Sequence, residues 1–133
     1  MSPGSKSLEM SYTSAKLKGT NYFMWAEHMQ AALQAKYLWL IVNGTEMCPS
    51  APPATKPPTT TATDYRIERK EHLDWLLRDK ATQGVMKGAC EDSQLPHVKD
   101  CTSAQDLWDT LKKIHVTYHA RINAHYYFED LYT

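Results

Sequence analysis

Histidine is the residue type in this 133-residue chain that first suggests metal chemistry, because six are present. His115 and His119 are four residues apart, so on a helix both imidazoles would share one face, as in many zinc sites. The residue after His115 is Val116, whereas the H-E-x-x-H zinc motif requires a glutamate there. His125 belongs to no recognisable metal-binding motif. No Asp or Glu stands at the spacing from these histidines that a third metal ligand would have in a known motif. We therefore interpret the histidines as partly exposed surface or interface residues and predict no metal ion and no cofactor.

Cysteine usage indicates a reducing compartment. Cys48, Cys90 and Cys101 are odd in number and contain no C-x-x-C pair, so they predict neither a disulfide framework nor a zinc ribbon. His97 lies between two of them, but this spacing does not match a zinc knuckle. No signal peptide and no apolar run long enough to span a membrane is visible, which favours a cytoplasmic protein without a membrane partner.

The sequence contains no motif that is typical of nucleophilic catalysis. There is no G-x-S-x-G elbow, and the five glycines form no phosphate-binding loop. Asp109-Thr110-Leu111 matches the aspartic-protease triplet at two positions, but a core leucine replaces the glycine that the catalytic loop needs. Asp79 could act as a general base, although a carboxylate on a helix at the margin of a core more often caps a neighbouring helix or pairs with Lys or Arg. We predict no enzymatic activity and no small-molecule substrate.

The charges of the chain cancel, with 15 Lys+Arg against 15 Asp+Glu. A protein that neutralises phosphates normally carries a basic excess, so binding to RNA is expected to be weak or to depend on a separate downstream region. A neutral surface also suits packing against further copies without long-range repulsion. A local basic patch is the alternative, although acidic residues are interspersed with it; it would comprise Arg66, Arg69, Lys70, Arg78, Lys80 and Lys87.

Apolar spacing predicts helices in the first part of the chain. Trp25, Met29 and Leu33 repeat every four residues, which predicts a helix over 22–35 with Asn21 as its N-cap. The apolar run 37–42 is expected to form a short buried helix, with a buried strand as the alternative. Asn43-Gly44 follows it and suits the left-handed conformation at a helix C-terminus.

A long loop with partly polyproline II character is expected over residues 45–63, where five of the seven prolines lie. Pro49 and Pro52 also form a P-x-x-P sequence, so a ligand for an aromatic groove is an alternative to a simple spacer. Asp64 is the expected N-cap of the next helix, which is predicted to end near Gly88.

Two adjacent rows of side chains on this helix predict a wide buried face. One row is Leu73, Leu77, Ala81 and Val85, and the other is Trp75, Asp79, Thr82 and Met86. A short turn over 93–98, interrupted at Pro96, is expected to follow. Thr102 and Gln105 then form a capping box ahead of a further amphipathic helix, and a last helical segment is expected over 122–132. No segment shows the alternation of apolar and polar residues that is typical of a β-strand, so the predicted fold class is all-α.

Tryptophans mark the expected core. Each of the four falls on the apolar face of a different predicted helix, as expected when large side chains from several helices meet. An aromatic surface that stacks nucleic-acid bases is the alternative, but basic residues are sparse around the rings. The predicted core anchors are Trp25, Trp39, Trp75, Leu107, Trp108 and Leu111.

The order of these anchors resembles the Gag region of Ty1/copia-type LTR retrotransposon polyproteins. The segment 16–22, Lys-Leu-Lys-Gly-Thr-Asn-Tyr, followed by Trp25, is similar to the opening of that family's domain. Trp75 and Asp79 match its W-x-x-x-D block, and the segment 102–111 is similar to its T-A-x-x-x-W-x-x-L block. The resemblance spans about residues 16–133, which we treat as one helical domain after a flexible leader over 1–15.

The resemblance implies a structural, capsid-like function. It implies a small orthogonal bundle of about five to six helices, like the N-terminal lobe of a capsid protein, whose copies pack into virus-like particles around the RNA of the element. The zinc knuckle and basic tail that often follow in such polyproteins are not in this sequence, and the family's domain would continue through further helices. A short host-retained product, acting as an adaptor or as an assembly inhibitor that binds a peptide or Gag, is the alternative.

Large apolar residues crowd the last eight positions of the sequence. A terminal helix that is apolar around much of its surface cannot bury all of them within one chain, and a second copy is the simplest cover. We therefore predict a homo-oligomer, a dimer, that also associates with longer Gag. The predicted self-association residues are Tyr126, Tyr127, Phe128, Leu131 and Tyr132.

Overall fold

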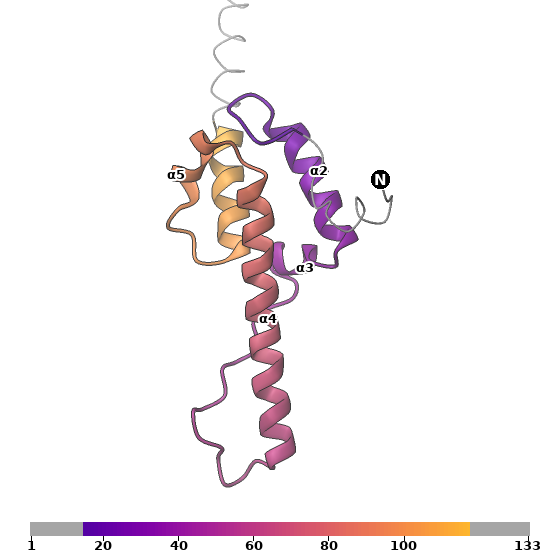
Figure 1. Ribbon diagram of the computed structural model, residues 1–133, viewed down its shortest axis with the longest axis vertical. Coiled ribbons are helices and arrows are strands. Elements are labelled where there is room, and N and C mark those ends of the chain that lie inside the picture. Colours follow the sequence, from indigo (N-terminus) through magenta and orange to yellow (C-terminus); the bar gives the residue numbers. More distant parts are fainter. Residues whose placement is uncertain (1–14, 118–133) are drawn as a thin grey trace, which may run out of the picture.

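Helices form the frame of the part of the chain that the structure, a computed structural model, describes, which is residues 15–117 (Figure 1). Over this range no β-strand is present, and one isolated parallel bridge joins Leu17 to Cys90. The predicted all-α class is confirmed. The predicted leader, apart from Ala15, and the last helical segment over 122–132 lie outside the described residues.

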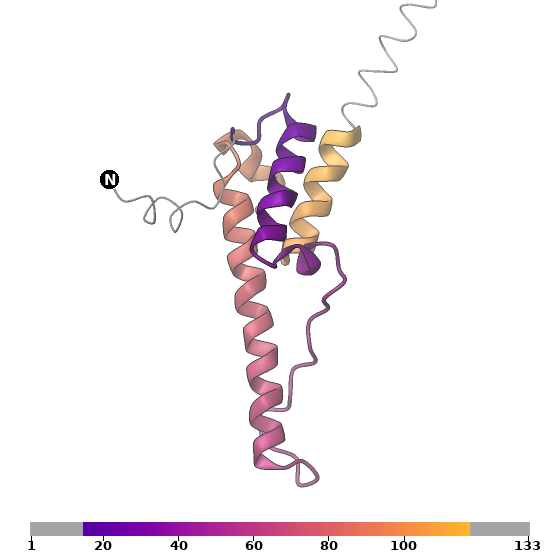
Figure 2. The same ribbon diagram turned by 90° about the vertical axis from the view of Figure 1, so that its right-hand side faces the viewer.

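The helices follow one another in the order α2 (Tyr22–Ala35), α3 (Trp39–Val42), α4 (Ala62–Gly88), the 3-10 turn η1 (Asp92–Gln94), α5 (Leu95–Val98) and a last helix that is described over 104–117. The prediction of α2 is confirmed at both ends. In both views α2, the second half of α4 and the helix 104–117 lie side by side, while the first half of α4 extends beyond them (Figures 1 and 2). Among the residues with described structure, no helix is both long and apolar enough to cross a bilayer.

α4 buries a narrower face than the sequence predicted. Its buried side chains are Asp79, Thr82, Gln83 and Met86. The predicted row of Leu73, Leu77, Ala81 and Val85 is wrong at its first three positions, because Leu73 is 54% exposed, Leu77 is 58% exposed and Ala81 is also exposed. Val85 is partly buried and packs against the core. α2 and the helix 104–117 pack on one side of α4 only, and neither of them reaches its first half (Figure 2).

Helix α4 is capped three residues before the expected position. The backbone N–H of Asp64 donates to Oγ1 of Thr61 at 3.1 Å, so Thr61 is the N-cap and Asp64 lies in the first turn, where a carboxylate interacts favourably with the helix dipole. The predicted cap at Asp64 is therefore wrong.

A capping box starts the helix 104–117, shifted by one residue from the prediction. The N–H of Asp106 donates to Oγ of Ser103 at 3.0 Å, and the N–H of Thr102 donates to Oδ2 of Asp106 at 3.2 Å. Ser103 and Asp106 thus replace the predicted Thr102 and Gln105 as the two partners, and they satisfy two donors near the start of the helix.

Two residues with special backbone requirements lie near the ends of the short helices. Gly44 has a φ of +82° after α3, as predicted from Asn43-Gly44, and a Cβ at this position would lie 2.7 Å from Nε2 of Gln105. Pro96 does not interrupt the 93–98 segment, because it lies in the first turn of α5, where a missing N–H leaves no intrahelical hydrogen bond unmade.

The core is built around a group of aromatic rings. The rings of Trp25 and Trp108 stack with centroids 6.0 Å apart, and Trp39 meets Trp108 edge-on at 5.0 Å. Fully or almost fully buried aliphatic side chains surround this group; they include Leu17, Met29, Leu33, Ile41, Val42, Met86, Leu107 and Leu111. Trp75 is only partly buried and lies at the edge of this core.

Candidate structural site and self-association surface

The segment from Leu17 to Trp25 is held against the end of α4 by hydrogen bonds. The carbonyl oxygen of Ala89 accepts two hydrogen bonds, from the N–H of Leu17 at 2.8 Å and from Nε1 of Trp25 at 2.9 Å. Glu91 N–H donates to the carbonyl of Leu17 at 2.9 Å. The segment therefore works as an anchor, and Leu17 is completely buried in it.

Asn21 shapes this anchor instead of capping α2. It occupies the N-cap position, but its side chain makes no capping hydrogen bond. Its Oδ1 accepts from the N–H of Lys18 at 2.8 Å, and its Nδ2 donates to the carbonyl of Lys16 at 2.9 Å. The predicted N-cap position of Asn21 is therefore confirmed, although its side-chain amide closes the preceding turn and does not cap the helix.

His115 is a core residue, so the prediction of an exposed or interface histidine is wrong at this position. Its ring stacks on Tyr22 with centroids 5.1 Å apart, and its Nε2 lies 2.8 Å from Oε1 of Gln94. It is buried because it follows Leu111 by one helical turn on the inner face of the helix. Burial, and secondarily the charge of Asp109, raises the pKa of Tyr22 to about 12.

Within residues 15–117, no group of three or more His, Cys, Asp or Glu side chains is arranged to hold a metal ion. His119 and His125 lie outside this range. The three cysteines are free; Cys48 is exposed, Cys101 is partly buried, and Cys90 is buried. Burial raises the pKa of the Cys90 thiol to about 11, which keeps it protonated near neutral pH.

Asp79 connects two helices. It is 3% exposed, its Oδ1 accepts from the N–H of Ala104 at 3.0 Å, and its Oδ2 accepts from Nε2 of Gln83 at 2.9 Å. The carboxylate therefore satisfies the first N–H of the helix 104–117 from a distant part of the chain. This confirms the interpretation that Asp79 caps a neighbouring helix, and it explains the W-x-x-x-D spacing, since Trp75 lies one turn earlier on the same face.

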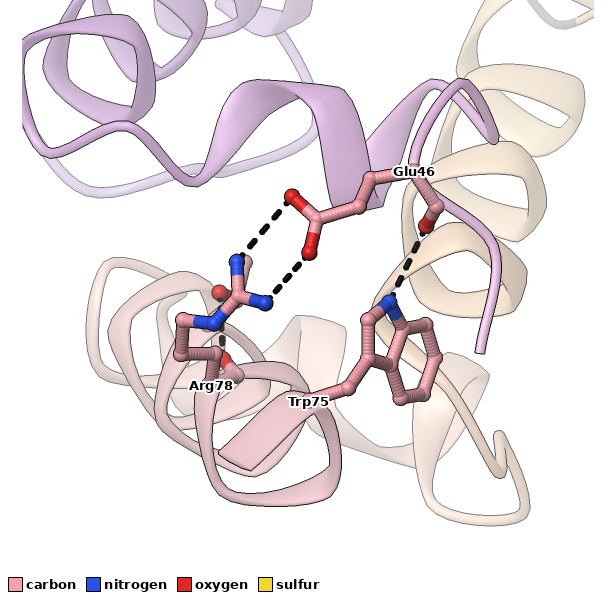
Figure 3. A network of polar contacts seen from close by, with 4 residues as sticks. Glu46, Trp75 and Arg78 are labelled. Carbon is pink, nitrogen blue, oxygen red and sulfur yellow. Dashed lines mark hydrogen bonds and ion pairs between the residues drawn. The ribbon is translucent and has the colours of Figure 1, made fainter. Parts of the chain in front are cut away.

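Figure 3 shows how Glu46 ties the loop after α3 to α4. Both terminal nitrogens of Arg78 donate to the Glu46 carboxylate, one of them at 3.0 Å to Oε1, and Nε1 of Trp75 donates to the Glu46 carbonyl at 3.0 Å. The hydrogen bond from Arg78 lowers the pKa of the Glu46 carboxyl below its ordinary value of 4.5, and it raises the pKa of Arg78.

This pair is expected to make stability depend on pH in the acidic range. Because the folded pKa of Glu46 is depressed, its contribution is complete above pH 4.5 and is lost as the pH falls through the lower folded pKa. Both side chains are more than a third exposed, so we expect at most about 1 kcal/mol. Urea unfolding of Glu46→Gln and wild type should differ by this amount at pH 7 and by less at pH 3.

Glu71→Gln, an exposed glutamate on α4, is the matched control and should unfold like wild type at both pH values. A Glu46→Gln difference that persists unchanged at pH 3 would show that the ion pair is not its source.

The proline-rich loop runs back along α4, held by side chains of the helix. Nδ1 of His72 lies 2.7 Å from the carbonyl of Pro49, and the hydroxyl of Tyr65 donates to the carbonyl of Pro53. Successive loop residues thus meet successively earlier helix residues, which makes the loop an extended antiparallel companion of the first half of α4 (Figure 2). No helix or strand interrupts it between residues 45 and 61.

A groove of about 730 Å³ lies between this loop and α4. Its basic lining residues are Lys56, Arg66, Arg69 and Lys70, and its apolar walls are Ala51, Pro52, Pro53, Ala54, Ala62 and Leu73, with Tyr65 and His72 completing it. None of these lining residues is acidic. The Arg69 guanidinium lies 5.7 Å from the centroid of the Tyr65 ring. The groove was not predicted from the sequence, although three of its four basic residues, Arg66, Arg69 and Lys70, belong to the basic patch considered there.

The outer face of α4 carries a row of exposed residues, which we call the outer row: Leu73, Leu77, Ala81, Gly84 and Gly88. The spacing of three or four residues places all five on one side of the helix, opposite Asp79 and Met86. A Cβ added at Gly84 or Gly88 would meet nothing within 4 Å, so the backbone is open to close approach there. Leu76, 37% exposed, borders the row.

The predicted site residues divide into two groups. Trp25, Leu107, Trp108 and Leu111 are buried, whereas Trp39 and Trp75 are partly buried and pack against the core. The predicted self-association residues lie outside the described residues, and they are Tyr126, Tyr127, Phe128, Leu131 and Tyr132.

Comparisons with known proteins agree on one family. The family described as gag-polypeptide of LTR copia-type matches residues 29–132. The Retrovirus-related Pol polyprotein from transposon RE1 of Arabidopsis thaliana is 31% identical over 101 residues, and that from transposon RE2 is 30% identical over 102 residues. Each alignment covers 75% of this chain but only 6% of the relative. No solved structure gives a significant match.

The family match extends over most of the chain, and it includes the Trp75, Asp79 and Trp108 positions whose contacts build the bundle. The chain therefore belongs to the copia-type LTR retrotransposon gag-polypeptide family.

Proposed function

We propose that this chain is a structural Gag protein that self-associates, as particle assembly requires, and that it performs no catalysis. The outer row of α4 is the observation that supports this proposal. Leu73 and Leu77 are each more than half exposed and lie one turn apart on the helix; Leu73 also borders the groove beside the proline-rich loop. Contiguous apolar surface of this kind is typical of protein contact sites.

A second copy suits the outer row because its side chains are large at one end, where the leucines lie, and small at the other, where the alanine and the glycines lie. In an antiparallel pair with a two-fold axis at Leu77, Leu73 of each copy lies level with Ala81 of the other, and Lys70 lies level with Gly84. Each large side chain then has a small neighbour beside it, which lets the helices approach closely. The zero net charge of the chain removes long-range repulsion between copies.

Leu77→Glu is expected to weaken self-association about 30- to 150-fold. A leucine that is 58% exposed gains about 1–1.5 kcal/mol when its remaining surface is buried, and a symmetric pair loses this contribution twice. Sedimentation velocity over a range of micromolar concentrations measures the change in the dissociation constant.

Leu40→Glu is the matched control, since Leu40 is a leucine with 50% exposure on α3, away from the outer row. It should leave the dissociation constant within about twofold of wild type. Equal effects of the two substitutions would contradict a contact at the outer row, and a strictly monomeric wild type at high concentration would contradict self-association itself.

A host-retained adaptor or assembly inhibitor is the second candidate, and the basic groove beside the proline-rich loop favours it, because such a groove can accept a peptide. An adaptor would form a defined small complex with a heterologous peptide or with longer Gag. Particle assembly would instead give growth that continues with concentration. Light scattering of the chain mixed with longer Gag distinguishes the two.

A further inference from the structure

The charges on the first half of α4 are sorted by face. One row of the groove lining repeats every three or four residues and therefore lies on one side of the helix; it comprises Ala62, Arg66, Arg69 and Leu73. Asp64, Glu68 and Glu71 have the same spacing but stand two residues later, which places them about 200° around the helix from that row. The zero net charge of the chain therefore conceals a basic surface on the groove side.

The cations of the groove are not neutralised by neighbouring carboxylates. The lining includes no Asp or Glu, and among residues 15–117 no ion pair involves a groove residue. Arg66, Arg69 and Lys70 are exposed. The Arg69 guanidinium lies over the ring of Tyr65, which holds it in place while its in-plane N–H groups remain able to donate to an anion.

Lys56 fixes a further positive charge on the loop side of the groove. Its ammonium donates to the carbonyl of Thr60 at 2.8 Å and to the carbonyl of Pro57 at 3.2 Å. These two hydrogen bonds hold the charge in place and leave one N–H of the ammonium for a ligand. The groove thus has cations on both of its walls.

The proline wall of the groove, formed by Pro52 and Pro53, suits a nucleic acid better than a peptide. An extended peptide gains much of its affinity from main-chain hydrogen bonds. Neither proline has an N–H to donate, and the carbonyl of Pro53 already accepts from the hydroxyl of Tyr65. The groove therefore offers cationic side chains and apolar surface, the two features that bind the phosphates and the unpaired bases of a single strand.

We propose that this groove binds single-stranded RNA, at a site made of α4 and the proline-rich loop. Arg66 and Lys70 are four residues apart, which separates them by about 6 Å along the helix axis and lets them contact neighbouring phosphates. Arg69 donates to the same strand, and an unpaired base packs against the proline wall. The charge balance of the whole chain predicted weak binding, but the strand meets only the basic face of α4.

The proposed RNA site does not depend on self-association. Leu73 belongs both to the groove and to the outer row, so pairing of copies would partly cover the site. Binding is therefore measured in wild type and in Leu77→Glu, in which the outer row no longer pairs. The groove variant and its control should differ by the same factor in both backgrounds.

Removing two charges from the groove tests the site on full-length chains. Arg66→Gln/Arg69→Gln should bind a fluorescein-labelled oligouridylate of about 20 nucleotides about tenfold more weakly than wild type at about 50 mM salt, as measured by fluorescence anisotropy. Each lost phosphate contact lowers the slope of log affinity against log salt by about 0.7, so the slope should fall by about 1.4. Arg66→Lys/Arg69→Lys keeps both charges and should retain most of the slope.

Lys112→Gln/Lys113→Gln is the matched control, because it removes two exposed charges from the helix 104–117, outside the groove. Its affinity should stay within about twofold of wild type. All four substituted positions are exposed, so circular dichroism of both variants should match that of wild type.

Three outcomes of these measurements overturn the proposal. One is the absence of RNA binding to wild type at high micromolar concentration. The second is an equal loss of affinity in the groove variant and in its control, which would reflect unspecific attraction. The third is a labelled polyglutamate peptide that binds as tightly as the RNA and also depends on Arg66 and Arg69, which would assign the groove to an acidic peptide, as an adaptor requires.

Discussion

Replacing Trp25 with alanine is expected to lower the free energy of unfolding by about 4 kcal/mol. Trp25 is 1% exposed, and its ring stacks on Trp108 in the middle of the core. The substitution removes most of this buried area and leaves a cavity that neighbouring helices cannot fill without shifting. It also removes the hydrogen bond from Nε1 to the carbonyl of Ala89. Urea unfolding followed by circular dichroism measures the loss.

Trp25→Phe separates packing from hydrogen bonding. The carbonyl of Ala89 keeps its hydrogen bond from the N–H of Leu17, so this variant should lose only about 1–2 kcal/mol. Trp75→Ala is the matched control at the edge of the core, where the partly buried ring should cost less than Trp25→Ala. A Trp25→Ala loss no larger than that of Trp75→Ala would contradict the central position of Trp25.

Asp79→Ala is expected to cost about 3 kcal/mol, the second largest effect. The substitution removes the helix cap and leaves the N–H of Ala104 without its acceptor in a buried site, while the Gln83 amide keeps only its longer hydrogen bond of 3.4 Å to the carbonyl of Thr102. Amide hydrogen exchange should therefore accelerate first at the start of the helix 104–117, where the cap was lost.

Asp79→Asn keeps one acceptor oxygen and should lose less than half as much as Asp79→Ala. Asp74→Ala, an exposed aspartate on the same helix, should change the free energy of unfolding by less than about 0.5 kcal/mol. If all three variants unfold at the same urea concentration, Asp79 does not stabilise the helix from α4.

Local sequence patterns predicted the helices well where each helix packs along its whole length. α2 is the clear case, since Trp25, Met29 and Leu33 repeat on one face and all three are buried. The same periodicity was misleading at Leu73 and Leu77, because a repeated apolar row shows that a face can be buried but not which element covers it. The first half of α4 extends past the other helices, so no described helix covers Leu73 and Leu77.

Caps and the groove depend on contacts that a local pattern does not contain. Thr102 and Ser103 can both cap a helix, and the structure uses Ser103, in register with the N–H of Ala104 that Asp79 reaches from α4. The role of Asp79 itself could be predicted, because a carboxylate at the margin of a helical core has few other uses. The groove could not, since its two sides come from a proline-rich loop and from α4 and meet only when the loop folds back.

The anchor between Leu17 and the end of α4 has a consequence for the order in which the protein folds. The partners of this anchor are far apart in the chain, with 64 residues separating Trp25 from Ala89. During synthesis α2 therefore leaves the ribosome well before the surface against which it packs, and closing so long a loop slows folding. Until Ala89 and Trp108 have emerged, Trp25 remains available to molecular chaperones.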